Sequence, residues 1–268
     1  MGLQSTTLGR SGLEACRIGL GGEYEISTND VRYALDRGIN LIWWDKAWPK
    51  MTAALQTLTK SQRGNIIIAA GSESRTIKGF EMALNIHTEA LKTDYIDLFI
   101  CYYINTWEEM ELLQSNVGAL NALREARENG TIRATAFTAH DRPLAARIAA
   151  TGAFDVAILR YNAAHVGAES EVFPIIQEQQ MGLCIYTPTR WGQLLEKPQG
   201  WNSSPPEPHE LFRFTLEHPA VNLAFTAPKN RNELDQNLKA VENDYELSPE
   251  RLDELRAYGQ LFREDMGL

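Results

Sequence analysis

The sequence predicts a closed (β/α)8 barrel that forms one domain over residues 1–268. Three observations lead to this fold class. Eight short apolar runs alternate with helical patterns from end to end. The length of 268 residues suits one barrel, which usually takes about 250. No internal repeat or long linker divides the chain.

Each expected strand is a run of apolar or β-branched residues, the pattern of a strand buried on both faces of a parallel sheet. These runs cover residues 17–21, 40–44, 65–70, 95–101, 132–137, 154–159, 182–186 and 221–225. The expected helices include residues 28–37, 110–128, 170–180 and a closing helix over 248–266, with Ser248 as its N-cap. Gly38 and Gly130 follow helices at C-cap positions, and Asp141 is placed to cap the helix after the fifth strand.

An open doubly wound sheet would also alternate strands and helices. A dinucleotide-binding sheet of that kind needs a G-x-G-x-x-G turn after its first strand. The segment Gly19-Leu20-Gly21-Gly22 lacks the third glycine and continues with Glu23. The closed barrel is therefore favoured.

Composition limits the classes of partner. The formal net charge of -9 argues against nucleic acid or an acidic membrane surface, because both require clustered Lys and Arg. The start MGLQSTTLGR has no apolar signal segment, and no stretch reaches the ~18 apolar residues of a membrane span. Three cysteines in apolar runs, Cys16, Cys101 and Cys184, indicate buried thiols in a reducing compartment. We expect a cytoplasmic protein with a small-molecule substrate.

The opening LGRSGLEACRIGLGG resembles the N-terminal hairpin and first strand of aldo-keto reductases. The resemblance continues in order through ALDRGINLIWWD, TDYIDLFI, GTIRATAFTAHD, RYNAAH, IYTPTRWGQLL and TAPKNRNELDQNL. It covers nearly the whole chain, and it implies a barrel that reduces carbonyl compounds with NADPH. In that family an Asp–Tyr–Lys–His tetrad performs the chemistry, with the tyrosine as general acid.

The tetrad positions of this chain depart from the family pattern. Asp45 matches the aspartate, whereas the tyrosine, lysine and histidine positions hold Lys50, Gly71 and Tyr102. Tyr102 could act as a general acid tuned by Asp45 or Lys50, or it could fill the space left by the histidine. Lys50 could lie near the reacting centre or simply face water.

The resemblance also implies contacts to NADP(H), if that cofactor is bound at all. These are Thr138 and Tyr186 at the nicotinamide, Arg190 beside the pyrophosphate, Lys229 and Asn230 at the 2'-phosphate, and Gln236 and Asn237 at the adenine. Ala139 and Ile158 replace two polar nicotinamide contacts of the family. The adenosine half of the site is thus better preserved than the reacting half.

Other candidates follow the strands at the C-terminal end of the barrel, where active sites of this fold lie. His140 could act as an acid or base or as a substrate ligand. The segment RYNAAH could bind an anion through its arginine. The candidate substrate-binding residues are Tyr24, Trp44, Arg160, Asn162 and Trp191. His140, His165, Asp45 and Glu23 show no ligand spacing, so no metal is expected. The Pro- and Ser-rich segment 196–209 could be a lid over the mouth or a plain surface loop.

Three functions stay open at this point. The first is a divergent aldo-keto-reductase-like oxidoreductase that acts on a small carbonyl compound. The second is a non-redox barrel enzyme (a lyase, cyclase or isomerase) that uses the emptied nicotinamide pocket for acid–base chemistry. The third is a binding or regulatory subunit without turnover.

Overall fold

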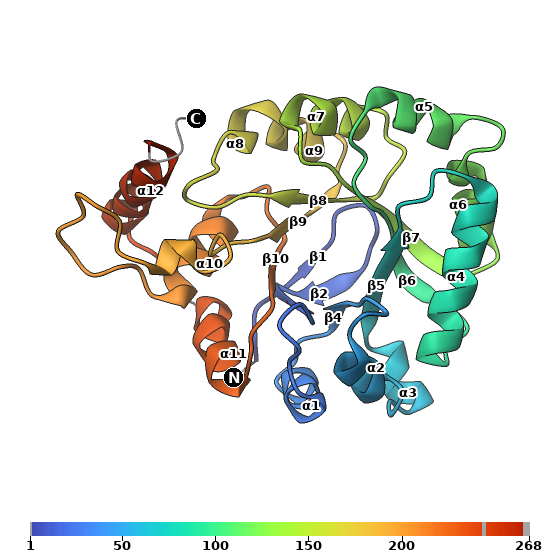
Figure 1. Cartoon of the computed structure of the whole chain (residues 1–268), viewed down its shortest axis with the longest axis horizontal. Helices are drawn as coiled ribbons and strands as arrows, with labels where there is room; N and C mark the ends of the chain where they lie inside the picture. The colour runs from blue at the N-terminus through green and yellow to red at the C-terminus, as the bar shows by residue number, and fades with distance from the viewer. Residues whose placement is uncertain (1, 243–244, 265–268) are drawn as a thin grey trace.

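The computed structural model describes residues 2–242 and 245–264. Within these residues, eight parallel strands close into a barrel in the order β10-β3-β4-β5-β6-β7-β8-β9, and helices surround the ring of strands (Figure 1). The barrel strands are β3 (Ile18–Gly21), β4 (Leu41–Trp43), β5 (Ile67–Ser72), β6 (Ile96–Cys101), β7 (Ile132–Thr138), β8 (Val156–Arg160), β9 (Gly182–Tyr186) and β10 (Leu223–Thr226). All eight expected strands are confirmed, with ends shifted by a few residues.

The helical elements follow the strands in chain order. They are α1 (Thr28–Asp36), α2 (Pro49–Leu55), α3 (Lys60–Gly64), α4 (Ile77–Leu91), α5 (Trp107–Gln114), α6 (Ala119–Glu128), α7 (Arg142–Ala150), α8 (Ala168–Glu171), α9 (Phe173–Glu178), η1 (Gln193–Leu195), α10 (Pro208–Glu217), α11 (Arg231–Leu238), η2 (Lys239–Val241) and α12 (Pro249–Glu264). Among the described residues, none of these helices is long and apolar enough to cross a membrane.

A hairpin closes the N-terminal end of the barrel. Its strands β1 (Ser5–Thr7) and β2 (Glu14–Cys16) pair antiparallel. Leu8, Leu13 and Ala15 join the apolar cluster inside the barrel. Side chains alternate along the strands, so Ile67 belongs to this inner cluster and Ile68 to the layer between strands and helices. The C-terminal mouth is left as the accessible end.

The expected helix over residues 110–128 is wrong as a single element, because the chain breaks between α5 and α6. Gly118 N-caps α6 and lies beside Thr76, with which it forms a bridge. A Cβ atom at Gly118 would lie 2.1 Å from the carbonyl oxygen of Leu112. Glycine therefore permits a turn that a longer side chain would block.

The expected helix over residues 170–180 also divides, into α8 and α9 around Val172, whose φ is -121°. The physical reason is Pro174, since proline lacks an N–H and its ring clashes with the carbonyl four residues earlier in a helix. The caps are confirmed. Gly38 and Gly130 have φ of 106° and 81°, and the Asp141 carboxylate accepts from the Leu144 N–H over 2.8 Å.

The closing helix is observed as α12, with the Ser248 hydroxyl oxygen accepting from the Arg251 N–H over 3.2 Å. Residues 265 and 266 of the expected helix lie outside the described residues. This helix holds the segment after β9. Tyr258 is wholly buried and its hydroxyl bonds the carbonyl oxygens of Leu194 and Glu196, while its ring contacts Trp201. The start of the segment 196–209 is therefore anchored to α12.

Buried carboxylates tie the lower parts of the strands together. Asp97 of β6 is wholly buried and lies 2.7 Å from the Arg63 guanidinium and 2.8 Å from that of Arg133. It also accepts from the Ile68 N–H over 2.9 Å. These contacts link β6 to both neighbouring strands, away from the C-terminal mouth.

Candidate active site

An aromatic wall lines the C-terminal mouth of the barrel. It consists of Phe225, Trp43, Tyr102, Tyr103, His140 and Tyr186. Trp43 and Tyr102 lie nearly parallel with ring centroids 6.0 Å apart, and Tyr103 stacks on His140 at 5.4 Å. Aromatic faces of this kind suit a planar or apolar ligand.

Tyr102 lies in the floor of this mouth. The indole N–H of Trp43 donates to the Tyr102 hydroxyl oxygen over 2.7 Å. Burial raises the pKa of Tyr102, the bond from Trp43 opposes that rise, and the negative charge of Asp45 adds to it. The phenol therefore stays protonated, and because its oxygen already accepts from Trp43, its own proton can be donated to another acceptor.

Sequence reasoning missed Trp43 and selected its neighbour Trp44. Trp44 is 1% exposed, donates to the Thr52 hydroxyl over 2.8 Å and packs edge-on against His87. It thus lies between barrel and helices, away from the mouth. Side chains alternate along a strand, so the inward-facing position before Asp45 is Trp43.

Gly71, which the sequence comparison places at the family's lysine position, has no room for a side chain. A Cβ atom at Gly71 would lie 1.9 Å from the carbonyl oxygen of Ile100, its partner on β6. The Gly71 carbonyl accepts from the Nε2–H of His87 over 2.8 Å. Burial lowers the pKa of His87, so this imidazole is a neutral donor that fixes the end of β5. Nothing in the sequence singled out His87, since it lies inside an ordinary helical pattern.

Asp45 and Lys50 have separate environments. The Asp45 carboxylate accepts from the Ala47 N–H over 2.7 Å and acts electrostatically on Tyr102 and Tyr103. The Lys50 ammonium lies 3.1 Å from the Glu25 carboxylate, and about half of its side chain is exposed at 51%. The structure therefore brings Asp45, but not Lys50, into the surroundings of Tyr102.

His140 and Thr138 follow β7 at the same end. The ring of His140 is exposed between Tyr103 and Tyr186. The hydroxyl oxygen of Thr138 accepts from the Tyr103 N–H over 2.7 Å. Thr138 is buried and supports the left-handed backbone of Tyr103, which has φ of 49°.

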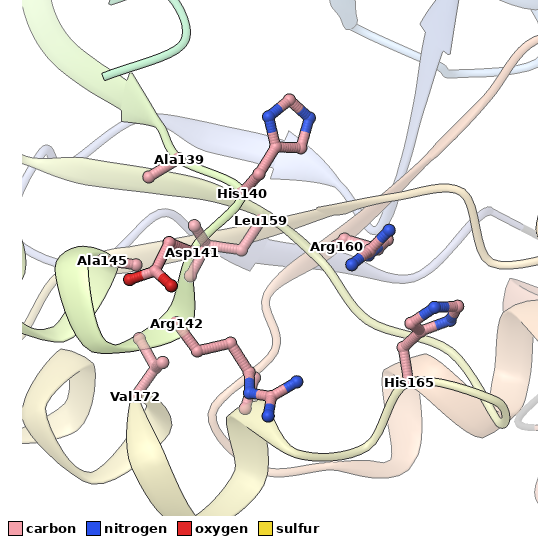
Figure 2. A pocket seen from close by; sticks show the side chains of 10 residues that line it. Ala139, His140, Asp141, Arg142, Ala145, Leu159, Arg160, His165 and Val172 are labelled. Atoms are coloured by element: carbon pink, nitrogen blue, oxygen red, sulfur yellow. The ribbon is translucent and has the colours of Figure 1, made fainter. Parts of the chain in front are cut away.

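A small hollow opens between the loops that follow β7 and β8 (Figure 2). Arg142, Arg160 and His165 surround it in this view, while the ring of His140 points away from them. Asn162 is wholly buried below this loop, where its amide donates to the Thr187 carbonyl over 2.8 Å and accepts from the Ala164 N–H. Asn162 therefore shapes the loop rather than contacting a substrate.

The end of β9 and the segment after it carry three residues that were expected to contact a ligand. Tyr186 is half-buried at the end of β9, and burial raises its pKa to about 12, with nearby Arg160 opposing the rise. Arg190 is buried, and its guanidinium donates to the Phe262 carbonyl of α12 over 3.2 Å. Trp191 is 59% exposed with left-handed backbone. Tyr186 thus lies partly buried in the mouth and Trp191 is exposed to solvent, while Arg190 also holds α12.

The segment after β10 carries the remaining residues that were expected to contact a cofactor. The Lys229 ammonium is exposed and lies 5.6 Å from the centroid of the Tyr24 ring. Asn230 N-caps α11 by accepting from the Glu233 N–H over 3.1 Å. Gln236 is half-buried, and Asn237 is buried with its amide donating to the Thr226 hydroxyl over 2.7 Å.

The residues present fit one end of a dinucleotide better than the other. Lys229 next to the N-terminus of α11 offers positive charge to a phosphate, whereas the N–H groups of Lys229 and Glu233 are bonded to the side chains of Glu233 and Asn230. At the nicotinamide end, Tyr186 offers a ring face, whereas Ala139 and Ile158 offer no side-chain hydrogen bond. Thr138 is already bonded to Tyr103.

The fold and this mouth define a (β/α)8-barrel protein whose candidate site lies at the C-terminal ends of the strands. A family model described as the Aldo/keto reductase family matches residues 20–212. The chain belongs to this family, which implies an oxidoreductase.

Two of the solved structures that share the fold are forms of one protein. The holo form of an aldo-keto reductase from Bacillus halodurans is 18% identical, with a TM-score of 0.79 and 96% of each chain covered. Its apo form is 19% identical, with a TM-score of 0.76 and the same coverage of 96%. At this identity the likeness concerns the fold alone. The search of curated proteins found no match.

Proposed function

We propose that this chain is an NADP(H)-dependent oxidoreductase that acts on a small carbonyl compound, with Tyr102 as the proton donor. The observation that carries the proposal is the 2.7 Å hydrogen bond from Trp43 to the Tyr102 hydroxyl oxygen in the mouth. This hydrogen bond holds the protonated phenol in place. The hydroxyl proton of Tyr102 remains available to the carbonyl oxygen of a substrate.

Reduction of a carbonyl requires a proton at the oxygen while a hydride reaches the carbon. When bound, the nicotinamide cofactor supplies the hydride. Tyr102 would donate the proton from the position directly after β6, where the family has its histidine. Because burial and the Asp45 charge raise the pKa of Tyr102, this tyrosine is a weaker acid than one tuned by a lysine. We therefore expect slow turnover on simple carbonyl compounds.

The residues proposed to hold the cofactor lie on two loops. Lys229 and the N-terminus of α11 would bind the 2'-phosphate, as supported by the exposed ammonium beside the positive end of the helix dipole. Tyr186 would stack on the nicotinamide ring. A cytoplasmic location is also proposed, supported by the three buried free thiols of Cys16, Cys101 and Cys184.

A non-redox lyase, cyclase or isomerase is the second candidate. Two features favour a non-redox enzyme. Gly71 has no room for a lysine side chain, and Ala139 and Ile158 cannot form the polar contacts that the family makes to the nicotinamide. Tyr102 beside Asp45 would then transfer protons without a cofactor. A regulatory subunit without turnover is the third candidate. The polar and aromatic side chains at the mouth argue against it, because they suit binding of a small molecule.

The deciding experiment is a titration of the purified protein with NADPH and NADP+, followed by cofactor fluorescence and by calorimetry. Lys229→Ala is the test variant. Lys239→Ala is the matched control, because Lys239 is exposed beyond the other end of α11. Micromolar binding that is lost in Lys229→Ala and kept in Lys239→Ala supports the proposal. No binding at millimolar cofactor rejects it and favours the non-redox enzyme.

A further inference from the structure

We propose that the hollow beside Arg160 is a binding site for the anionic group of a small molecule, a carboxylate or a phosphate. Where the protein acts as the oxidoreductase proposed above, this assigns its substrate class as an oxo acid. That last step alone rests on the proposed function, since the anion site itself requires neither cofactor nor turnover.

The first argument is geometric. Arg160 ends β8, Arg142 begins α7 and His165 lies in the loop after β8, and Figure 2 shows the three side chains around one hollow. A Cβ atom at Gly167 would lie 2.7 Å from the central carbon of the Arg142 guanidinium. The glycine therefore leaves the space in which this guanidinium lies.

The second argument concerns charge. Arg142 has one partner, since its Nε lies 3.0 Å from the Glu171 carboxylate. In the part of the chain that the structure describes, Arg160 makes no hydrogen bond and no ion pair with a carboxylate. Asp141 also lines the hollow, but its carboxylate is engaged as the N-cap of α7. A guanidinium presents five donors and matches a carboxylate or phosphate in a bidentate fashion.

The third argument is the fixed orientation of His165. The Asn162 amide nitrogen donates to the Thr187 carbonyl, so the Asn162 oxygen is the acceptor for the His165 Nδ1, 3.1 Å away. This bond requires the proton on Nδ1. A wholly buried asparagine therefore holds the imidazole at the edge of the hollow.

The position of Arg160 sets the kind of substrate. Arg160 pairs in register with Tyr186 on the next strand, and β8 is separated from the Tyr102 strand by β7. Neighbouring strands lie about 4.8 Å apart, so the two strands are roughly 10 Å apart. A substrate that reaches both residues has several bonds between its carbonyl carbon and its anionic group.

The test measures anion binding without cofactor. The probes are glutarate, its neutral analogue glutaramide and inorganic phosphate, and the readouts are calorimetry and the rise of the unfolding temperature with ligand. Arg160→Met is the test variant. Arg124→Met is the matched control, because Arg124 is exposed on α6 and makes no ion pair in the described residues.

The expected result is glutarate binding to the wild type and to Arg124→Met that is weakened ~10-fold or more in Arg160→Met, with no binding of glutaramide. Phosphate binding with the same dependence on Arg160, and none of glutarate, supports the anion site and assigns it to phosphate. Equal affinities of wild type and Arg160→Met overturn the proposal, as does the absence of binding by any anion. If Arg160→Met does not fold, Arg160→Lys tests the same point, since it keeps the charge and loses the bidentate geometry.

Discussion

The indole nitrogen of Trp43 and the hydroxyl oxygen of Tyr102 lie 2.7 Å apart in the mouth of the barrel, with the indole N–H as donor. The two rings are also nearly parallel, at an angle of 9°. Trp43 therefore fixes both the position of the phenol and the lone pair that its oxygen uses. This contact joins strands β4 and β6, which are not neighbours in the sheet.

Replacement of Tyr102 by phenylalanine is expected to lower kcat for carbonyl reduction by about 100-fold or more, because the proton donor is lost. Steady-state kinetics with NADPH would measure it. Tyr103→Phe is the control, since Tyr103 is exposed at 42% and stacks on His140. A Tyr102→Phe enzyme with the wild-type rate would show that the donor is another group. The variant also leaves the Trp43 N–H without its partner, at a cost of about 1 kcal/mol in stability.

Gly71→Ala is expected to destabilise the protein by about 2 kcal/mol or more, because the new Cβ would overlap the Ile100 carbonyl at 1.9 Å. Gly64→Ala is the matched control, as nothing lies within 4 Å of a Cβ at that position of α3. We expect it to be neutral or to stabilise by up to about 1 kcal/mol. Urea unfolding of both variants measures the difference, and equal midpoints would contradict the packing at Gly71.

The raised pKa of Tyr186 predicts a loss of stability at alkaline pH. Burial moves this pKa from 10.0 to about 12 in the folded protein. Below pH 10 both states keep the proton and the contribution of Tyr186 is fully present. As the pH rises from 10 to 12 the unfolded state loses its proton first, so the folded state is progressively destabilised.

Thermal unfolding between pH 9 and 12 measures this effect. Tyr186→Phe should reduce the decline in unfolding temperature, whereas Tyr24→Phe at the exposed mouth should leave it unchanged. Absorbance at alkaline pH should also show one late-titrating phenol fewer in Tyr186→Phe. The same decline in both variants and the wild type would argue against burial of the Tyr186 hydroxyl.

Asp97→Asn is expected to lower the free energy of unfolding by about 3 kcal/mol, because it leaves the cations of Arg63 and Arg133 without their buried partner. Asp94→Asn serves as the control, since Asp94 is exposed, and should change stability by less than about 0.5 kcal/mol. Denaturant unfolding distinguishes the two. A mild effect at Asp97 would mean that solvent replaces the lost ion pairs.

Most of the fold could be predicted from the pattern of apolar runs. Strands buried on both faces produce such runs, and all eight were found at their places. The errors lay where backbone sterics interrupt a helical pattern. Gly118 permits a turn against Leu112, and Pro174 prevents a continuous helix from α8 to α9.

The candidate site was predicted less well, and the reasons differ from residue to residue. The sequence analysis names Trp44 as a candidate, whereas an inward-facing Asp45 implies that Trp43 faces the interior. Lys50 was considered near the reacting centre, but its pairing with Glu25 depends on a loop that no sequence pattern describes. The sequence predicts Arg160 as an anion ligand, yet that no carboxylate among the described residues pairs with it is a property of the packed loops.

The sequence by itself determined the barrel and the family, because these follow from the order of apolar runs and from motifs along the chain. Only the tertiary structure decided which side chains share the mouth. Trp43 and Tyr102, or Arg160 and Arg142, come from different strands and loops. Their contacts depend on barrel closure and side-chain direction, which bring together residues far apart in the chain.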